Sequence, residues 1–164
     1  MICSPTAAEK FGELSQDNSM VEPLSRGKHS VINGITIRAV YADHGELASD
    51  SIGILIDTGD FIIYYSSDTA FKPNETAESL GCVPDLAILP INGMYGNLNS
   101  YEAAKLAEYL RIKQVIPCHF WTFREHNGKN GDPLSFETAM KKYHAEGNPV
   151  FLTPGEILIL KKEV

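Results

Sequence analysis

The 164-residue sequence has few cysteines and no long apolar run. Its three thiols, Cys3, Cys82 and Cys118, are an odd number without a Cys-x-x-Cys spacing. This argues against a disulfide framework and against a cysteine-rich zinc site. No apolar stretch reaches the roughly 18 residues that a membrane span requires, and the N-terminus lacks the basic and apolar regions of a signal peptide. We therefore expect a cytoplasmic protein without a membrane partner.

Positive charge is also scarce, because 14 Lys and Arg residues stand against 21 Asp and Glu residues, giving a net charge of −7. The longest basic runs are the pairs Lys141-Lys142 and Lys161-Lys162. Neutralisation of phosphates dominates affinity for nucleic acids, so we expect no nucleic-acid partner. A small-molecule substrate, including an anionic one, is compatible with this charge, since a bound metal can supply positive charge locally.

The length suits one domain with a substantial core, and the apolar pattern predicts several strands. Alternation predicts a strand over 35–41, and two apolar runs at 52–56 and 61–65 around a glycine-bearing turn predict a hairpin. Shorter strands of the buried type are predicted over 85–90 and 114–118. A second hairpin is predicted to close the chain, with arms over 150–153 and 156–160.

Three helices are predicted, one before these strands and two among them. Ser4-Pro5 is a helix start that leads into a helix over 6–14, while Ser100 and Ser135 are predicted to cap the other two helices. The helix from Ser100 to Arg111 has apolar residues at helical spacing on one face. Hairpins at both ends and strand-helix-strand order between them predict an α/β domain with a mixed sheet.

Three polar residues follow predicted strands directly: His44, Asp68 and His119. Strand ends hold side chains rigidly and leave them open to a cleft, which suits metal ligands. Imidazole and carboxylate together suit zinc, manganese or iron. Taken singly, a histidine after a strand is usually a loop or core residue, and an aspartate before threonine is usually a turn residue.

Further candidates for substrate contact come from two polar segments. Asn92, Tyr95 and Asn97 belong to a glycine-containing segment that follows the strand predicted at 85–90, on the same expected edge of the sheet. The alternative for this segment is a plain glycine-rich turn. His126 lies in a polar loop and is a candidate for contact with substrate or metal.

The order of these motifs resembles the second half of the metallo-β-lactamase superfamily. The motifs are Ala42-Asp43-His44-Gly45, a hairpin, Ser67-Asp68-Thr69, the apolar segment from Pro84 to Ile91, and Val115-Ile116-Pro117-Cys118-His119. The branch that they resemble most is the predicted metal-dependent hydrolases similar to ascorbate-6-phosphate lactonase. The resemblance covers roughly residues 31–123.

The resemblance implies a role for each strand-end residue. His44 is similar to the third histidine of the first metal site, Asp68 to the aspartate that bridges two metals, and His119 to the last histidine on the second metal. It implies one or two zinc or manganese ions, with Asp68 and His119 as catalytic residues. The implied reaction is hydrolysis of a lactone, ester or phosphoester by a metal-bound hydroxide. One departure is Ser67, where the family has glycine.

The larger departure is the absence of the family's His-x-His-x-Asp-His signature. We therefore expect residues 1–164 to be a single domain, the C-terminal αβ half of a four-layer αββα sandwich, without its N-terminal half. The alternative is a non-catalytic half-domain that acts as an assembly or binding module. In that case an apolar sheet face would pair with a second copy and give a homo-oligomer. The residues expected on this face are Ile52, Ile54, Ile56, Ile62 and Tyr64.

Overall fold

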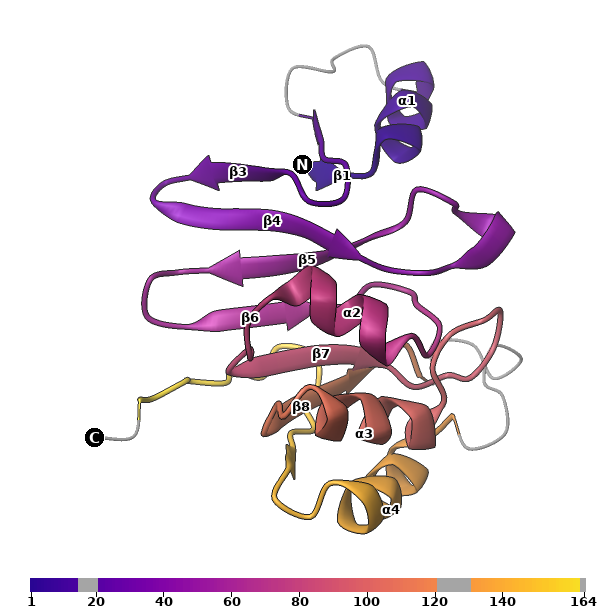
Figure 1. Ribbon diagram of the computed structural model, residues 1–164, viewed down its shortest axis with the longest axis vertical. Helices are drawn as coiled ribbons and strands as arrows, with labels where there is room; N and C mark the ends of the chain where they lie inside the picture. Colours follow the sequence, from indigo (N-terminus) through magenta and orange to yellow (C-terminus); the bar gives the residue numbers. More distant parts are fainter. Residues whose placement is uncertain (15–20, 121–130, 163–164) are drawn as a thin grey trace.

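The computed structural model describes residues 1–14, 21–120 and 131–162, and its centre is a mixed seven-stranded sheet (Figure 1). Strands β3 to β6 are antiparallel neighbours, and strands β6 to β9 are parallel neighbours. The predicted α/β class with a mixed sheet is confirmed. In sheet order, the strands are β3 (His29–Ile32), β4 (Ile35–Tyr41), β5 (Ile52–Asp57), β6 (Ile62–Tyr65), β7 (Leu86–Pro90), β8 (Gln114–Cys118) and β9 (Asn148–Pro149).

Strand direction decides where the loops meet. Strand β5 is antiparallel to both β4 and β6, so β4 runs in the same direction as β6, β7 and β8. The last residues of these four strands, Tyr41, Tyr65, Pro90 and Cys118, therefore lie along one edge of the sheet. We call this the carboxyl edge. The segments that contain His44, Asp68, Asn97 and His119 all begin there.

One face of the sheet carries the main core. Helices α2 (Pro73–Leu80), α3 (Ser100–Tyr109) and α4 (Pro133–Tyr143) supply its helical side, and Figure 1 shows α2 and α3 in front of the sheet. Tyr64, Leu89 and Val115 from the strands are buried against Leu106 and Phe136 from the helices. Arg38 of β4 fastens the end of α2, because its guanidinium donates to the Ser79 carbonyl at 2.8 Å.

The opposite face is only partly covered. Leu55 and Tyr64 pair in register and belong to the main core, so the adjacent pairs Ile54–Tyr65 and Ile56–Ile63 face the other way. The placement of Ile62 and Tyr64 on this second face is therefore wrong, because both pack on the helix side. We call the second face the open face. Its half-buried or exposed apolar residues are Ile37, Ile54, Ile56, Ile63, Tyr65, Ile88 and Ile116.

The N-terminal segment covers the β4–β5 end of the open face. It contains β1 (Ile2–Cys3), which pairs with β2 (Glu22–Pro23), and α1 (Pro5–Leu14). Leu24 is buried against Ala39 and Ile52, with Ile2 and Ile54 packed beside them. The helix predicted after Ser4-Pro5 is confirmed, whereas no strand is predicted before residue 35 and the structure has β1, β2 and β3 there.

Several helix starts differ from the prediction. Asn99, not Ser100, caps α3 and forms a capping box with Glu102. Asp132, not Ser135, caps α4, because the Ser135 N–H donates to the Asp132 carboxylate at 2.9 Å. A short 3-10 helix at Gly45–Leu47 follows His44. No helix in the described parts of the chain is long and apolar enough to cross a membrane.

The C-terminal hairpin predicted over 150–160 does not form. A turn is present, since the Glu156 N–H donates to the Thr153 carbonyl at 3.0 Å. The arms around it are not strands, and Ile157 and Ile159 point to solvent. The first arm packs on the domain instead of on the second arm, because the Phe151 ring contacts Phe136 and the Val150 N–H donates to the Val115 carbonyl at 2.8 Å.

Candidate metal centre

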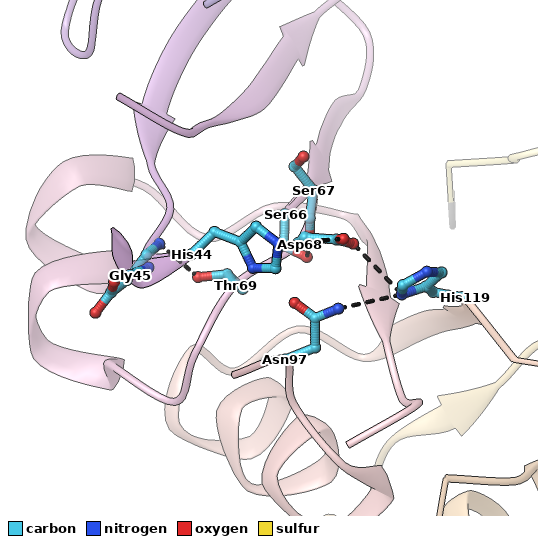
Figure 2. A network of polar contacts seen from close by, with 9 residues as sticks. His44, Gly45, Ser66, Ser67, Asp68, Thr69, Asn97 and His119 are labelled. Carbon is cyan, nitrogen blue, oxygen red and sulfur yellow. Dashed lines mark hydrogen bonds and ion pairs between the residues drawn. The ribbon is translucent and has the colours of Figure 1, made fainter. Parts of the chain in front are cut away.

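Three of the predicted site residues converge at the carboxyl edge. His44 follows β4, Asp68 follows β6 and His119 follows β8 (Figure 2). His44 Nε2 lies 3.9 Å from Asp68 Oδ2, and His119 Nδ1 lies 3.5 Å from Asp68 Oδ1. Each imidazole therefore faces a different oxygen of the same carboxylate.

Backbone hydrogen bonds fix the loops that carry these side chains. The Asp43 N–H donates to the Thr69 hydroxyl at 2.9 Å, and the Ala70 N–H donates to the Asp43 carbonyl at 2.7 Å. The Leu98 N–H donates to the Thr69 carbonyl at 2.9 Å. Thr69 is buried and connects the loops after β4, β6 and β7. The hydrogen bonds of Thr69, the next residue in the chain, therefore fix the position of Asp68.

The backbone at this edge is strained at several non-glycine residues. Ser67, Tyr95 and His119 have φ of 58°, 56° and 56°, which is the left-handed region that side chains rarely adopt. Such strain gathers at functional sites, where the surrounding structure maintains it. Ser67 thus adopts a backbone conformation that glycine would adopt without strain.

Asn97 lies beside His119 instead of at the surface. Its side-chain amide nitrogen is 3.2 Å from His119 Nδ1, and the residue is buried. The Asn97 Oδ1 atom is buried and has no hydrogen-bond partner among the described residues. Asn97, which the sequence predicts to contact substrate, is therefore placed to orient the His119 ring. Asn92 is in the interior, Tyr95 is exposed, and His126 lies outside the described residues.

Imidazole nitrogens and a carboxylate suit a divalent metal, but the described residues supply few of them. His119 Nδ1 lies beside the Asn97 amide, so Nε2 is the nitrogen of this ring that is left for a metal. His44 Nδ1 is a buried nitrogen without a partner in the described structure. Within the described residues, however, no three His, Cys, Asp or Glu side chains gather around one point. The site supplies two His–carboxylate pairs, whereas zinc sites have three or four protein ligands.

Cys118, next to His119, is suited to remain a thiol. Burial, and then the negative charge of Asp68, raises the pKa of Cys118 to about 12. Burial, followed by the charges of Cys118 and Asp68, also raises the pKa of Tyr65. The thiolate is the form of cysteine that binds metal, so the sulfur is a poor ligand at neutral pH.

Comparison with known proteins shows which family this chain is similar to. Residues 5–120 match the family described as the beta-lactamase superfamily domain. A protein of Hyperthermus butylicus named a UPF0173 metal-dependent hydrolase is 30% identical over 116 residues. A metal-dependent hydrolase of the same name from Thermus thermophilus is 31% identical over 162 residues, which is 94% of this chain. The structure of Igni18, a metallo hydrolase from Ignicoccus hospitalis, superposes with a TM-score of 0.73 at 20% identity, covering 99% of this chain.

The chain is shorter than these proteins. It spans 49% of the Hyperthermus protein, 66% of the Thermus protein and 69% of Igni18. The family match covers the β4 to β8 region and all three loops that carry His44, Asp68 and His119. The chain therefore belongs to the metallo-β-lactamase superfamily.

Proposed function

We propose that this chain is the part of a metal-dependent hydrolase that holds the bridging carboxylate and one histidine on each side of it. The observation that carries the proposal is the position of Asp68, whose two oxygens face His44 and His119 separately. The relatives named metal-dependent hydrolases support it. The proposed cofactor is zinc or manganese, and the proposed substrates are small lactones, esters or phosphoesters.

His44, Asp68 and His119 would hold the metal. A divalent cation in such a site lowers the pKa of a coordinated water and polarises the oxygen of the bond that is cleaved. Asp68 and His119 are each more than a third exposed, so this side of the site is open to a substrate. Asn97 would keep the His119 ring in place, and Tyr95 at the rim would contact the substrate.

A second candidate is a non-catalytic assembly module that pairs with another copy of the chain. Two observations favour it: each proposed metal position has only two ligands among the described residues, and the open face leaves apolar side chains half-exposed. Large exposed apolar faces mark association sites. In this candidate the proposed partner is a second copy, as in most soluble oligomers.

Metal content and turnover, measured on the same purified sample, separate the candidates. Elemental analysis and dialysis against zinc and manganese would be combined with a panel of esters, lactones and phosphodiesters, with and without EDTA. Turnover that requires both the metal and Asp68 would support a complete hydrolase. We expect metal binding without appreciable turnover from residues 1–164 alone, because more ligands are needed. Failure of wild-type protein to bind either metal would overturn the proposed site.

A further inference from the structure

A second cleft lies at the other end of the strands from the candidate metal centre. It has a volume of about 450 Å³ and is formed where β7 and β8 begin, between the turn before β7, the end of α3 and the C-terminal segment. Figure 1 shows the C-terminal segment, in yellow, passing this end of β7. Strand β7 has five residues, so the two sites are separated by roughly 15 Å of strand. We call it the basic cleft.

Four cationic side chains line the basic cleft: Arg111, Lys113, Lys161 and Lys162. This is a marked local concentration in a chain with 14 basic residues and a net charge of −7. The pair Lys161-Lys162 is unremarkable in the sequence, and the fold brings it beside two cations that lie far away along the chain. Neither the metal centre nor the proposed reaction uses any of them.

Two carboxylates, Asp60 and Asp85, lie at the basic cleft against its four cations. Asp60 is 3.2 Å from the Lys162 ammonium, and the Asp85 carboxylate accepts a hydrogen bond from the Ile62 N–H at 2.7 Å. The side chains of Arg111 and Lys113 make no ion pair with any described residue. The basic cleft therefore has an excess of positive charge that an anion would neutralise.

Arg111 is held at the cleft by an unusual helix end. The Arg111 N–H donates to the Glu108 carbonyl and the Ile112 N–H to the Ala107 carbonyl, which is the Schellman pattern that closes a helix. Glycine commonly occupies the left-handed position of this motif, but Arg111 has it here, with φ of 58°. A charged side chain is thus kept where a glycine would fit with less strain.

The basic cleft also has an apolar part. Phe61 and Leu160 line it, and the Lys162 ammonium is 5.9 Å from the centroid of the Phe61 ring. Its volume falls in the range that small-molecule sites occupy. Guanidinium and ammonium groups are the usual partners of phosphate oxygens. A polynucleotide needs an extended basic track, and these cations gather at one cleft instead.

We infer that the basic cleft binds a small organic phosphate, with its phosphate groups against Arg111, Lys113 and Lys161 and an aromatic or apolar portion against Phe61. The site is separate from the proposed hydrolase centre and does not require a metal.

The test is calorimetric titration of the metal-free chain, kept in EDTA at low ionic strength, with ADP as the probe. Pyrophosphate and adenosine are titrated separately, so that the affinity from the phosphate groups can be told from the affinity from the aromatic base. We expect ADP to bind more tightly than pyrophosphate, and adenosine not to bind measurably. The double variant Lys113→Gln/Lys161→Gln should weaken ADP binding at least tenfold, because both side chains face the anion. The variant Phe61→Leu should weaken ADP binding while leaving pyrophosphate binding unchanged.

A matched double variant, Lys10→Gln/Lys28→Gln, removes the same charge from exposed positions outside the basic cleft and should change ADP affinity less than twofold. Equal losses in the two double variants would show a nonspecific charge effect and overturn the inference. So would loss of ADP binding in His119→Ala, which would place the ligand at the metal centre. A DNA oligonucleotide that bound more tightly than ADP, or the absence of any binding by ADP and pyrophosphate, would also overturn it.

Discussion

At the scale of single residues, the proposed metal centre depends on one carboxylate, because both imidazoles face Asp68. We predict that Asp68→Ala lowers the affinity for zinc or manganese more than His119→Ala does. The first change removes a ligand from both proposed positions, whereas the second removes one from a single position. Both residues are partly exposed, so the free energy of unfolding in metal-free buffer should change by less than about 0.5 kcal/mol. Isothermal titration and urea unfolding measure the two effects.

His29→Ala is the control for these variants, since His29 is exposed at the start of β3, outside the candidate centre. Unchanged metal affinity in both Asp68→Ala and His119→Ala would reject the assignment of these residues as ligands. A fall in affinity for His29→Ala as large as that for His119→Ala would point to binding by scattered surface histidines.

Tyr64 is a residue whose hydroxyl opposes folding. The side chain is fully buried in the main core, its oxygen has no hydrogen-bond partner among the described residues, and burial raises its pKa. An unpaired buried hydroxyl costs about 1–3 kcal/mol. We predict that Tyr64→Phe leaves the chain as stable or makes it more stable by about 1 kcal/mol, as urea unfolding would show. Destabilisation by Tyr64→Phe beyond about 1 kcal/mol would mean that the hydroxyl has a partner after all.

At the scale of elements, the start of α4 depends on Asp132. Its carboxylate accepts from the Ser135 N–H at 2.9 Å and the Ser135 hydroxyl at 2.7 Å. Burial opposes ionisation, but these bonds and one from the Leu134 backbone outweigh it and hold the pKa of Asp132 below its usual value. We predict that Asp132→Ala lowers the free energy of unfolding by about 1 kcal/mol at neutral pH. Chemical denaturation across a pH series measures this loss.

The pH dependence has a definite sign. A carboxyl with a lowered pKa in the folded state contributes stability above its unfolded pKa, about 3.9, and loses it as the pH falls through the folded value. The difference between wild type and Asp132→Ala should therefore be constant near neutrality and shrink below about pH 4. Asp132→Asn retains an acceptor for the cap but cannot ionise, so its stability should lack this acid-dependent part.

The sequence predicts the strands well where apolar residues alternate or form short runs, as in β4 to β8. It does not predict α2, because Pro73–Leu80 buries only Thr76 and Leu80 and has too few apolar residues to show a helical face. The helix is held by tertiary contacts instead, including the bond from Arg38 to Ser79.

The same distinction applies to the candidate site. His44, Asp68 and His119 could be found because each follows a strand, and strand direction then brings them to one edge. The contact between Asn97 and His119 depends on how a loop folds back after β7, which no spacing reveals. The basic cleft is equally hidden, since its cations come from two distant segments of the chain.

At the scale of the whole molecule, the open face is the feature that should govern behaviour in solution. We predict that the chain self-associates and that Ile56→Glu shifts it to the monomer, because a charge would then be buried in the contact. Burial of several hundred Å² of apolar surface at about 25 cal/mol per Å² favours pairing by several kcal/mol before the cost of association. Light scattering over a concentration series measures the change.

Leu134→Glu is the matched control, because Leu134 is an exposed leucine on α4 and lies on the helix side. It should leave the association unchanged. A wild-type chain that stays monomeric at all concentrations would contradict the prediction. An association that Leu134→Glu disrupts and Ile56→Glu does not would move the contact to the helices.

The common direction of β4, β6, β7 and β8 also bears on how the chain reaches its fold. Strands β6, β7 and β8 are parallel neighbours, which cannot be joined by tight turns, so Asp68 and His119 meet only after the long segments between these strands have been ordered. Such distant contacts form slowly, because the entropy of loop closure must be overcome first. Contacts that are absent from the folding transition state change the unfolding rate instead of the folding rate. A divalent cation held at Asp68 would therefore slow unfolding and leave folding nearly unchanged, so that metal supply would set the lifetime of the native state.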